Sequence, residues 1–247
     1  MSFVYILALG ALQGLTEFLP VSSSAHLELL SAFSGVPEQG RFFAVAAHVG
    51  SLLAVLWHYR ARVMEMLVLK DRPLALKLAV SFLPVLALGL VFDPPGGART
   101  IAWCSIVFGL LLWLADRFGR NDAPVGPLSA FLAGCAQVVA LMPGVSRSGI
   151  VLTSLRVQGI SREKAMDFAF LMSIPAIAAA GAYELLRALG APGPVDWGAS
   201  ASAVAASFLF SLLAIRFMLA FVRRFPFSVF AAYRVALGVV LLVFVAK

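Results

Sequence analysis

Six apolar stretches, each about as long as a membrane-spanning helix, constrain the fold of this chain more than any other feature. A helix that crosses a hydrocarbon core of ~30 Å needs about 20 predominantly apolar residues. Breaks rich in Pro, Gly and charged residues separate these stretches. We therefore predict transmembrane helices over residues 42–59, 75–92, 100–116, 165–187, 199–222 and 227–246.

The composition excludes a soluble fold. Hydrophobic residues make up 62% of the 247 residues and charged residues only 13%. Soluble chains contain about 45–50% hydrophobic residues and about 25% charged residues. The net charge of +7 does not indicate nucleic-acid binding, because the basic residues lie between the apolar stretches. We predict an all-α polytopic membrane protein that has the lipid bilayer as a partner and does not bind nucleic acid.

Two further apolar segments are too short to cross a bilayer. One begins at residue 3 and is interrupted by Gln13 and Glu17; the other begins at residue 128 and runs into Pro143. A Pro- and Ser-rich break and a second short apolar run follow each of them. Non-helical backbone at membrane depth occurs only where protein buries it or where it lines a wet cavity. We therefore predict re-entrant helix–loop–helix hairpins over residues 3–34 and 128–160.

The two predicted hairpins resemble each other at a constant offset of about half the chain. The pairs of identical residues are Gly10 and Gly134, Gln13 and Gln137, Val21 and Val145, Ser22 and Ser146, and Ser24 and Ser148. This similarity predicts a single membrane domain, 1–247, made of two repeats, 1–123 and 124–247, each with one hairpin and three spans. Because three is an odd number, the second repeat enters the membrane in the opposite orientation, as an inverted repeat.

The basic residues indicate which way the chain crosses the membrane. Cytoplasmic loops of membrane proteins carry an excess of Lys and Arg. If the first hairpin enters from outside, only Arg41, Arg99, Arg187 and Lys247 lie at the outer edges. The inner loops then carry Arg60, Arg62, Lys70, Arg72, Lys77, Arg117, Arg120, Arg156, Arg162, Lys164, Arg216, Arg223 and Arg224. We therefore predict that the first hairpin opens to the outer face, with Arg147 and Arg234 inside the membrane.

Polar side chains are concentrated at the two predicted hairpin tips. Ionisable groups at membrane depth are costly and therefore indicate function. In an inverted repeat the two tips meet near the midplane, where these side chains form an anion site. The first tip supplies Glu17, Ser22, Ser23, Ser24 and His26, and the second supplies Ser146, Arg147 and Ser148.

The chemistry of these groups suits a phosphate. A helix N-terminus offers backbone N–H groups and the positive end of its dipole, and Arg147 adds a bidentate guanidinium. Beside a phosphate, Glu17 is best explained as a ligand of Mg²⁺ or Ca²⁺ or as a carboxylate that orients a catalytic group. Ser23 and His26 share a helix face. The imidazole can activate a hydroxyl, protonate a leaving oxygen or attack phosphorus itself.

Each of these residues also has a structural explanation. Serines can permit close helix packing, Glu17 can pair with Arg147 without doing chemistry, and Gln13 and Gln137 can satisfy broken backbone. A histidine on an apolar span, such as His48, is more often a packing residue than a ligand. Arg234 can line the site or snorkel to the interface.

Two motifs resemble those of a known family. QGLTEFLPVSSSAHL in the first half and PGVSRSG in the second are similar to signatures of the integral membrane undecaprenyl-diphosphate phosphatases, the bacitracin-resistance type. FFAVAAHVGSLLAVLW and SREKAMDFAFLMSIPA also resemble this family, so the likeness covers nearly the whole chain. It implies hydrolysis of a polyprenyl diphosphate lipid with a divalent cation, Mg²⁺ or Ca²⁺, at the outer face of a bacterial inner membrane. Besides the lipid substrate and the bilayer, we consider a second copy of the chain as a partner, in a homodimer.

The anion site and the resemblance together suggest roles for the residues at the tips. Glu17, Ser23, His26 and Arg147 are the expected catalytic residues, and Glu17 is also the expected metal ligand. Ser23 is the expected nucleophile with His26 as its acid or base, and direct attack by His26 is the alternative. The expected substrate-binding residues are Gln13, Ser22, Ser24, Ser146, Ser148 and Gly149.

The chain departs from the family pattern at two positions. Gln13 stands where the first acid of the E-x-x-x-E signature is usual, which removes a negative charge from the expected metal site. Val151 stands where a threonine usually follows the S-R-S-G motif, and Thr153 lies two positions further on. These departures bear on metal affinity and turnover and leave the expected fold unchanged.

Transport is the rival function. Inverted repeats with broken helices are the architecture of secondary transporters, and a site for a lipid phosphate could carry the lipid across the membrane. Ser23 with His26 discriminates between the two, because a binding site alone has little need of a nucleophile beside a proton donor. A purely structural or signalling protein would leave Glu17, His26 and Arg147 without a common purpose.

Overall fold

The computed structural model of the protein describes residues 3–34, 41–89, 96–120, 122–189 and 196–245. Over these ranges the regular elements are all α-helices, which confirms the predicted all-α class. The helices are α1 (Phe3–Phe18), α2 (Ser23–Ser34), α3 (Arg41–His58), α4 (Arg60–Leu67), α5 (Arg72–Leu88), α6 (Ala98–Phe118), α7 (Pro127–Val139), α8 (Arg147–Val157), α9 (Arg162–Leu189), α10 (Trp197–Phe221) and α11 (Ser228–Phe244).

A helix lies at each of the six predicted spans, with the end of the 75–92 segment and residue 246 outside the described residues. Three segments are long and apolar enough to cross a membrane: Ala98–Phe118, Arg162–Tyr183 and Trp197–Phe221. Phe3–Phe18, Val45–His58, Pro127–Val139 and Ser228–Phe244 are shorter apolar helices. Large apolar side chains such as Leu209 and Phe217 of α10 are about half exposed on the outside of the bundle. Such a surface suits contact with lipid.

Helix α4 lies in the break that follows the first predicted span, where we predicted no helix. Its sequence, RARVMEML, consists mostly of good helix formers. None of its residues is buried, so an apolar face could not be used to predict it. Two contacts attach it to the bundle. The Arg60 guanidinium donates to the Trp57 carbonyl at 2.9 Å, and Arg62 pairs with the Asp167 carboxylate of α9.

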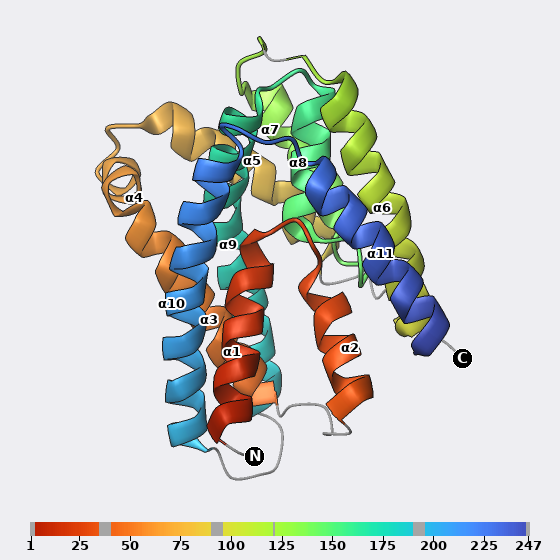
Figure 1. Ribbon diagram of the computed structural model, residues 1–247. Coiled ribbons are helices and arrows are strands. Elements are labelled where there is room, and N and C mark those ends of the chain that lie inside the picture. Colours follow the sequence, from red (N-terminus) through yellow and green to blue (C-terminus); the bar gives the residue numbers. More distant parts are fainter. Residues whose placement is uncertain (1–2, 35–40, 90–95, 121, 190–195, 246–247) are drawn as a thin grey trace.

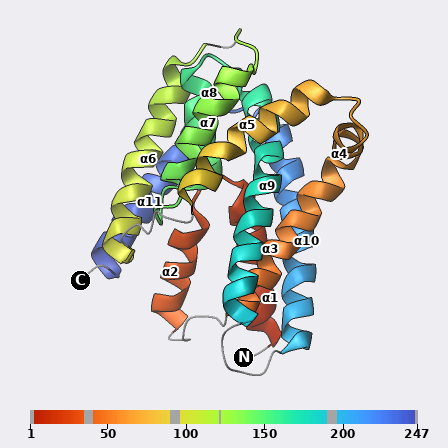
Figure 2. The ribbon, with the colours of Figure 1, turned by 180° about the vertical axis from the view of Figure 1, so that it is seen from behind.

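The two hairpins enter the bundle from opposite ends, and their tips meet in its middle (Figure 1). The first hairpin is α1 and α2, and the second is α7 and α8. Helix α1 packs against α10, and α7 packs against α5. Helices α6 and α11 run side by side, and Figure 2 shows from behind that α2 lies between this pair and α1.

Glycines permit the closest of these helix contacts. A Cβ atom added at Gly14 of α1 would lie 2.5 Å from the Ser207 carbonyl oxygen of α10. One added at Gly134 of α7 would meet the Ser81 carbonyl of α5 even more closely. Small residues at such crossings let backbones approach, which is the usual way that helices associate in a membrane.

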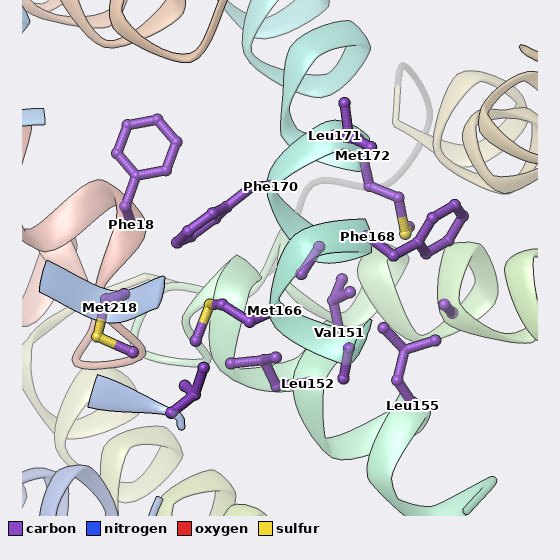
Figure 3. Packing of buried hydrophobic residues seen from close by; sticks show 14 of the residues in the cluster. Phe18, Val151, Leu152, Leu155, Met166, Phe168, Phe170, Leu171, Met172 and Met218 are labelled. Atoms are coloured by element: carbon purple, nitrogen blue, oxygen red, sulfur yellow. The ribbon is translucent and has the colours of Figure 1, made fainter. Parts of the chain in front are cut away.

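The largest apolar cluster holds the inner ends of both hairpins (Figure 3). Phe18 at the end of α1 meets Phe170 of α9 edge to face, with ring centroids 5.5 Å apart. Helix α8 contributes Val151, Leu152 and Leu155, all fully buried. The tips are therefore anchored in packed side chains, and the polar groups that they carry are held in place.

Candidate functional site

An ion pair joins the two hairpin tips. The Arg147 guanidinium at the start of α8 donates to Glu17 Oε1 near the end of α1 at 2.9 Å. The two side chains are only 16% and 11% exposed, respectively. Gln13, one turn before Glu17, donates from its amide nitrogen to the other carboxylate oxygen at 2.9 Å. The carboxylate therefore has a donor on each oxygen in an environment with little water.

Two further hydrogen bonds connect the tips directly. The backbone N–H of Gly144 donates to Ser24 Oγ at 2.9 Å, and the Ser148 hydroxyl donates to the Leu19 carbonyl at 3.0 Å. These bonds confirm the prediction that the two tips approach each other. They also show that Ser24 and Ser148, both expected to bind substrate, connect the hairpins to each other.

The serines at the two tips share an uncommon backbone conformation. Ser22 has φ of 72° and Ser146 has φ of 67°, in the left-handed region that residues with a Cβ seldom adopt. Each lies next to the first residue of a short helix. The hydroxyls of Ser22 and Ser24 are 3.1 Å apart, and the Ser146 hydroxyl accepts from the Gly149 N–H at 3.2 Å. The left-handed residue turns each chain sharply into its second helix.

His26 is held by partners that the sequence did not predict. Its Nδ1 lies 2.7 Å from the Ser22 carbonyl oxygen, and its Nε2 lies 2.6 Å from the hydroxyl of Tyr233 in α11. Ser23, the expected nucleophile, is half-buried, and its hydroxyl has no hydrogen bond to another described residue. Its expected partnership with His26 stays a prediction. The only sequence signal for Tyr233 is its position beside Arg234, a charged residue in an apolar helix.

Arg234 neither snorkels nor faces solvent in the site; it lies fully buried beneath the second tip. One terminal nitrogen donates to the Gly144 carbonyl at 2.9 Å and to the Val145 carbonyl at 2.7 Å. Its Nε and other terminal nitrogen have no partner among the described residues. A Cβ atom added at Gly149 would lie 2.7 Å from that free nitrogen. Gly149, expected to bind substrate, therefore also makes room for Arg234.

The remaining expectations around the site have mixed outcomes. His48 lies on α3 and is half-buried, and its role stays a prediction. Gln137 is buried, and its amide oxygen has no hydrogen-bond partner among the described residues, so it leaves a polar atom unsatisfied. Val151 is fully buried in the apolar cluster. The Thr153 hydroxyl donates to the Gly149 carbonyl at 2.8 Å, within its own helix.

Glu17 and Gln13 are the side chains at the tips that could hold a divalent cation. Within the described ranges, no three His, Cys, Asp or Glu side chains cluster as metal ligands. Glu17 is the carboxylate at the tips, and the amide of Gln13 lies beside it. Mg²⁺ is commonly bound by one or two carboxylates together with water and substrate phosphates. Glu17 and Gln13 fit that mode.

A second buried charge cluster holds the other end of α8. The Asp116 carboxylate accepts from Arg156 Nε at 3.1 Å, from Arg162 Nε at 2.7 Å and from the Phe227 N–H at 2.9 Å. Arg156 also donates to the Arg120 and Gly119 carbonyls. We predicted Arg156 in an inner loop, but it lies in the last turn of α8 and its side chain is only 1% exposed. Asp116 lies within a predicted span, where periodicity alone does not identify its partners.

Comparison with known proteins identifies the family. A family model described as bacitracin resistance protein BacA matches residues 6–240. A protein of Alcanivorax borkumensis named undecaprenyl-diphosphatase is 39% identical, with 100% of both chains covered. Proteins with the same name from Roseobacter denitrificans and Maricaulis maris are 40% and 41% identical, with 99% of each chain covered. The protein whose hairpin tips are joined by Glu17 and Arg147 thus belongs to the bacitracin resistance protein BacA family.

Proposed function

We propose that this protein hydrolyses undecaprenyl diphosphate to undecaprenyl phosphate and inorganic phosphate, and that the reaction takes place at the two hairpin tips. Such a reaction recycles the lipid carrier for peptidoglycan and other envelope polymers and confers bacitracin resistance. The Glu17–Arg147 pair is the observation that carries the assignment, because it places a cation and a carboxylate together at the broken helices. Relatives that are about 40% identical over the whole chain carry the name of this enzyme.

Arg147 is the proposed phosphate ligand. Its guanidinium can form paired hydrogen bonds with phosphoryl oxygens, and it is the first residue of α8, so the positive end of that helix adds to its charge. The positive end of α2 also faces this region, because Ser23 is the first residue of that helix. When a diphosphate binds between the tips, Arg147 would give up part of its contact with Glu17 and donate to the phosphate oxygens.

Ser23 is the proposed nucleophile. Its oxygen bonds to the terminal phosphorus while the bond from that phosphorus to the bridging oxygen breaks. His26 Nε2 takes the hydroxyl proton and returns it to the departing undecaprenyl phosphate. Water then attacks the phosphoserine, which releases inorganic phosphate and restores the Ser23 hydroxyl. Direct attack by His26 would instead leave the phosphoryl group on nitrogen.

The proposed cofactor is Mg²⁺ or Ca²⁺, held by Glu17 and the Gln13 amide together with the diphosphate. When bound, it would neutralise charge on the phosphoryl oxygens. The chain's own contribution is to present Glu17 in a fixed orientation, because Gln13 and Arg147 each donate to one of its oxygens. Exchange of the Arg147 contact on substrate binding would free one of these oxygens.

We also propose the inverted repeat, a bacterial inner-membrane location and a site that opens to the outer face. Equivalent features support the repeat. Ser22 and Ser146 both have left-handed backbone, and Gly10 lies against α10 as Gly134 lies against α5. In a Cys135→Ser background, a membrane-impermeant thiol reagent added to intact cells should label Arg99→Cys and not Arg120→Cys. The reverse pattern would contradict the proposed orientation.

Phosphate release in detergent tests the reaction. Purified protein should release phosphate from undecaprenyl diphosphate, and Arg147→Ala should lose this activity. Arg120→Ala is the matched control, because Arg120 pairs with Asp122 on the surface and its side chain is 81% exposed. A transporter would release no phosphate. Labelled phosphate trapped in acid-stable form on Ser23 would support the serine mechanism, and acid-labile label on His26 would support the alternative.

A further inference from the structure

We propose that Tyr233 is a positioning residue that fixes the orientation of the His26 imidazole and of its Nε2 lone pair. The proposal rests on the role of His26 as acid or base given above. The two side chains come from α2 and α11, 207 residues apart in the chain. Their rings are nearly parallel, with an interplanar angle of 13°, and the tyrosine oxygen lies 2.6 Å from Nε2.

The two hydrogen bonds together determine where the imidazole proton lies. The Ser22 carbonyl can only accept, so Nδ1, 2.7 Å away, must carry the proton and donate it. In the neutral ring Nε2 then carries the lone pair, and the Tyr233 hydroxyl donates to it. The nitrogen that can act as a base is therefore Nε2, and the tyrosine orients its lone pair until a reacting hydroxyl replaces it.

The position of Tyr233 is itself set by the second hairpin. The next residue on α11, Arg234, is fully buried and donates to the Gly144 and Val145 carbonyls of that tip. Helix α11 also packs along α6. The helix that orients the His26 ring is thus attached to the tip that carries Arg147. Through the adjacent residues Tyr233 and Arg234, α11 thus contacts both His26 of the first hairpin and the tip of the second hairpin.

Tyr233→Phe tests the proposal, because it keeps the ring and removes only the hydroxyl. We expect kcat for undecaprenyl diphosphate to fall about tenfold, as for the loss of one hydrogen bond, and KM to change less than twofold. Adding Tyr233→Phe to His26→Gln should reduce activity no further, since the tyrosine acts through the histidine. Independent, multiplying losses in the double variant would overturn the proposal. Tyr183→Phe of α9 is the control, because Tyr183 has the same exposed fraction, 46%.

A second measurement does not depend on catalysis. Nitrogen NMR of protein labelled with ¹⁵N-histidine, with the His26 signals identified by their loss in His26→Gln, reports which ring nitrogen carries the proton. The wild type should show Nδ1 protonated by its bond to Ser22, and Nε2 unprotonated with the chemical shift of a nitrogen that accepts a hydrogen bond. Tyr233→Phe should keep the proton on Nδ1, and its Nε2 signal should move to the chemical shift of a nitrogen that accepts none. The same His26 spectrum in both would overturn the proposal. If the wild type releases no phosphate, the proposed function fails, whereas this spectrum still decides the role of Tyr233.

Discussion

Glu17 and Arg147 lie 130 residues apart in the chain and form an ion pair of 2.9 Å at the meeting point of two broken helices. Neither side chain is more than 16% exposed, so each charge depends on the other and on the amide of Gln13. Breaking a buried pair by removing one partner is costlier than removing both, because a lone charge remains without compensation. The pair is thus a structural link between the hairpins as well as the proposed centre of the reaction.

The first prediction concerns the stability that this pair provides. Arg147→Met should lower the free energy of unfolding by about 3 kcal/mol, because it leaves the Glu17 carboxylate without its cation. The double variant Glu17→Gln/Arg147→Met should be more stable than Arg147→Met alone. Thermal unfolding in detergent measures both. Equal melting temperatures for Arg147→Met and the double variant would mean that the unpaired Glu17 carboxylate is not the source of the loss.

The second prediction concerns the divalent cation. Gln13→Glu would place a second carboxylate one helical turn from Glu17, in the position from which the Gln13 amide now donates. Two carboxylates attract a cation more strongly than one, so half-maximal phosphate release should need less Mg²⁺ or Ca²⁺ than in the wild type. Chelator should abolish the activity of both forms. Phosphate release that survives chelation would contradict the proposed metal. Gln13→Ala serves as the matched control, since it removes the amide without adding charge.

Segment lengths and hydropathy were enough to predict most helices and both hairpins. A bilayer sets the length of a span, and two interrupted segments of similar sequence are conspicuous in such a chain. Glu17 and Arg147 could be predicted as neighbours because each is a charge in a segment too short to span. The spacing of residues along a helix also predicts Ser23 and His26 on one face, and their partnership stays a prediction.

What the sequence did not reveal depends on contacts between distant helices. Tyr233 reads as one more aromatic residue in an apolar helix, and only the packing of α11 beside α2 brings it to His26. Arg156 follows an apolar run and resembles a loop residue, but Asp116 of α6 compensates its charge inside the protein. Helix α4 has no buried face, so hydrophobic periodicity could not predict it.

The third prediction separates two explanations for Gly149. If the residue is glycine because Arg234 fills the space beside it, Gly149→Ala should destabilise the protein, since the new Cβ would lie 2.7 Å from the guanidinium. Shortening the arginine in Gly149→Ala/Arg234→Met should relieve that clash, so the two changes should cost less than their sum. Thermal unfolding of the two single variants and the double variant decides this. Gly126→Ala should be close to neutral, because nothing lies within 4 Å of its added Cβ. Additive losses would favour a purely substrate-binding role for Gly149.

The fourth prediction concerns the far end of α8. Asp116→Ala should lower the free energy of unfolding by about 3 to 5 kcal/mol, because it removes the carboxylate paired with the Arg156 side chain, which is 1% exposed. Asp122→Ala breaks a pair whose side chains are 81% and 67% exposed, so it should leave the melting temperature nearly unchanged. Because α8 carries Arg147 at its other end, the Asp116 variant should also lose phosphate release at temperatures where the control stays active. An Asp116→Ala protein as stable as the Asp122→Ala control would mean that other contacts hold α8 in place.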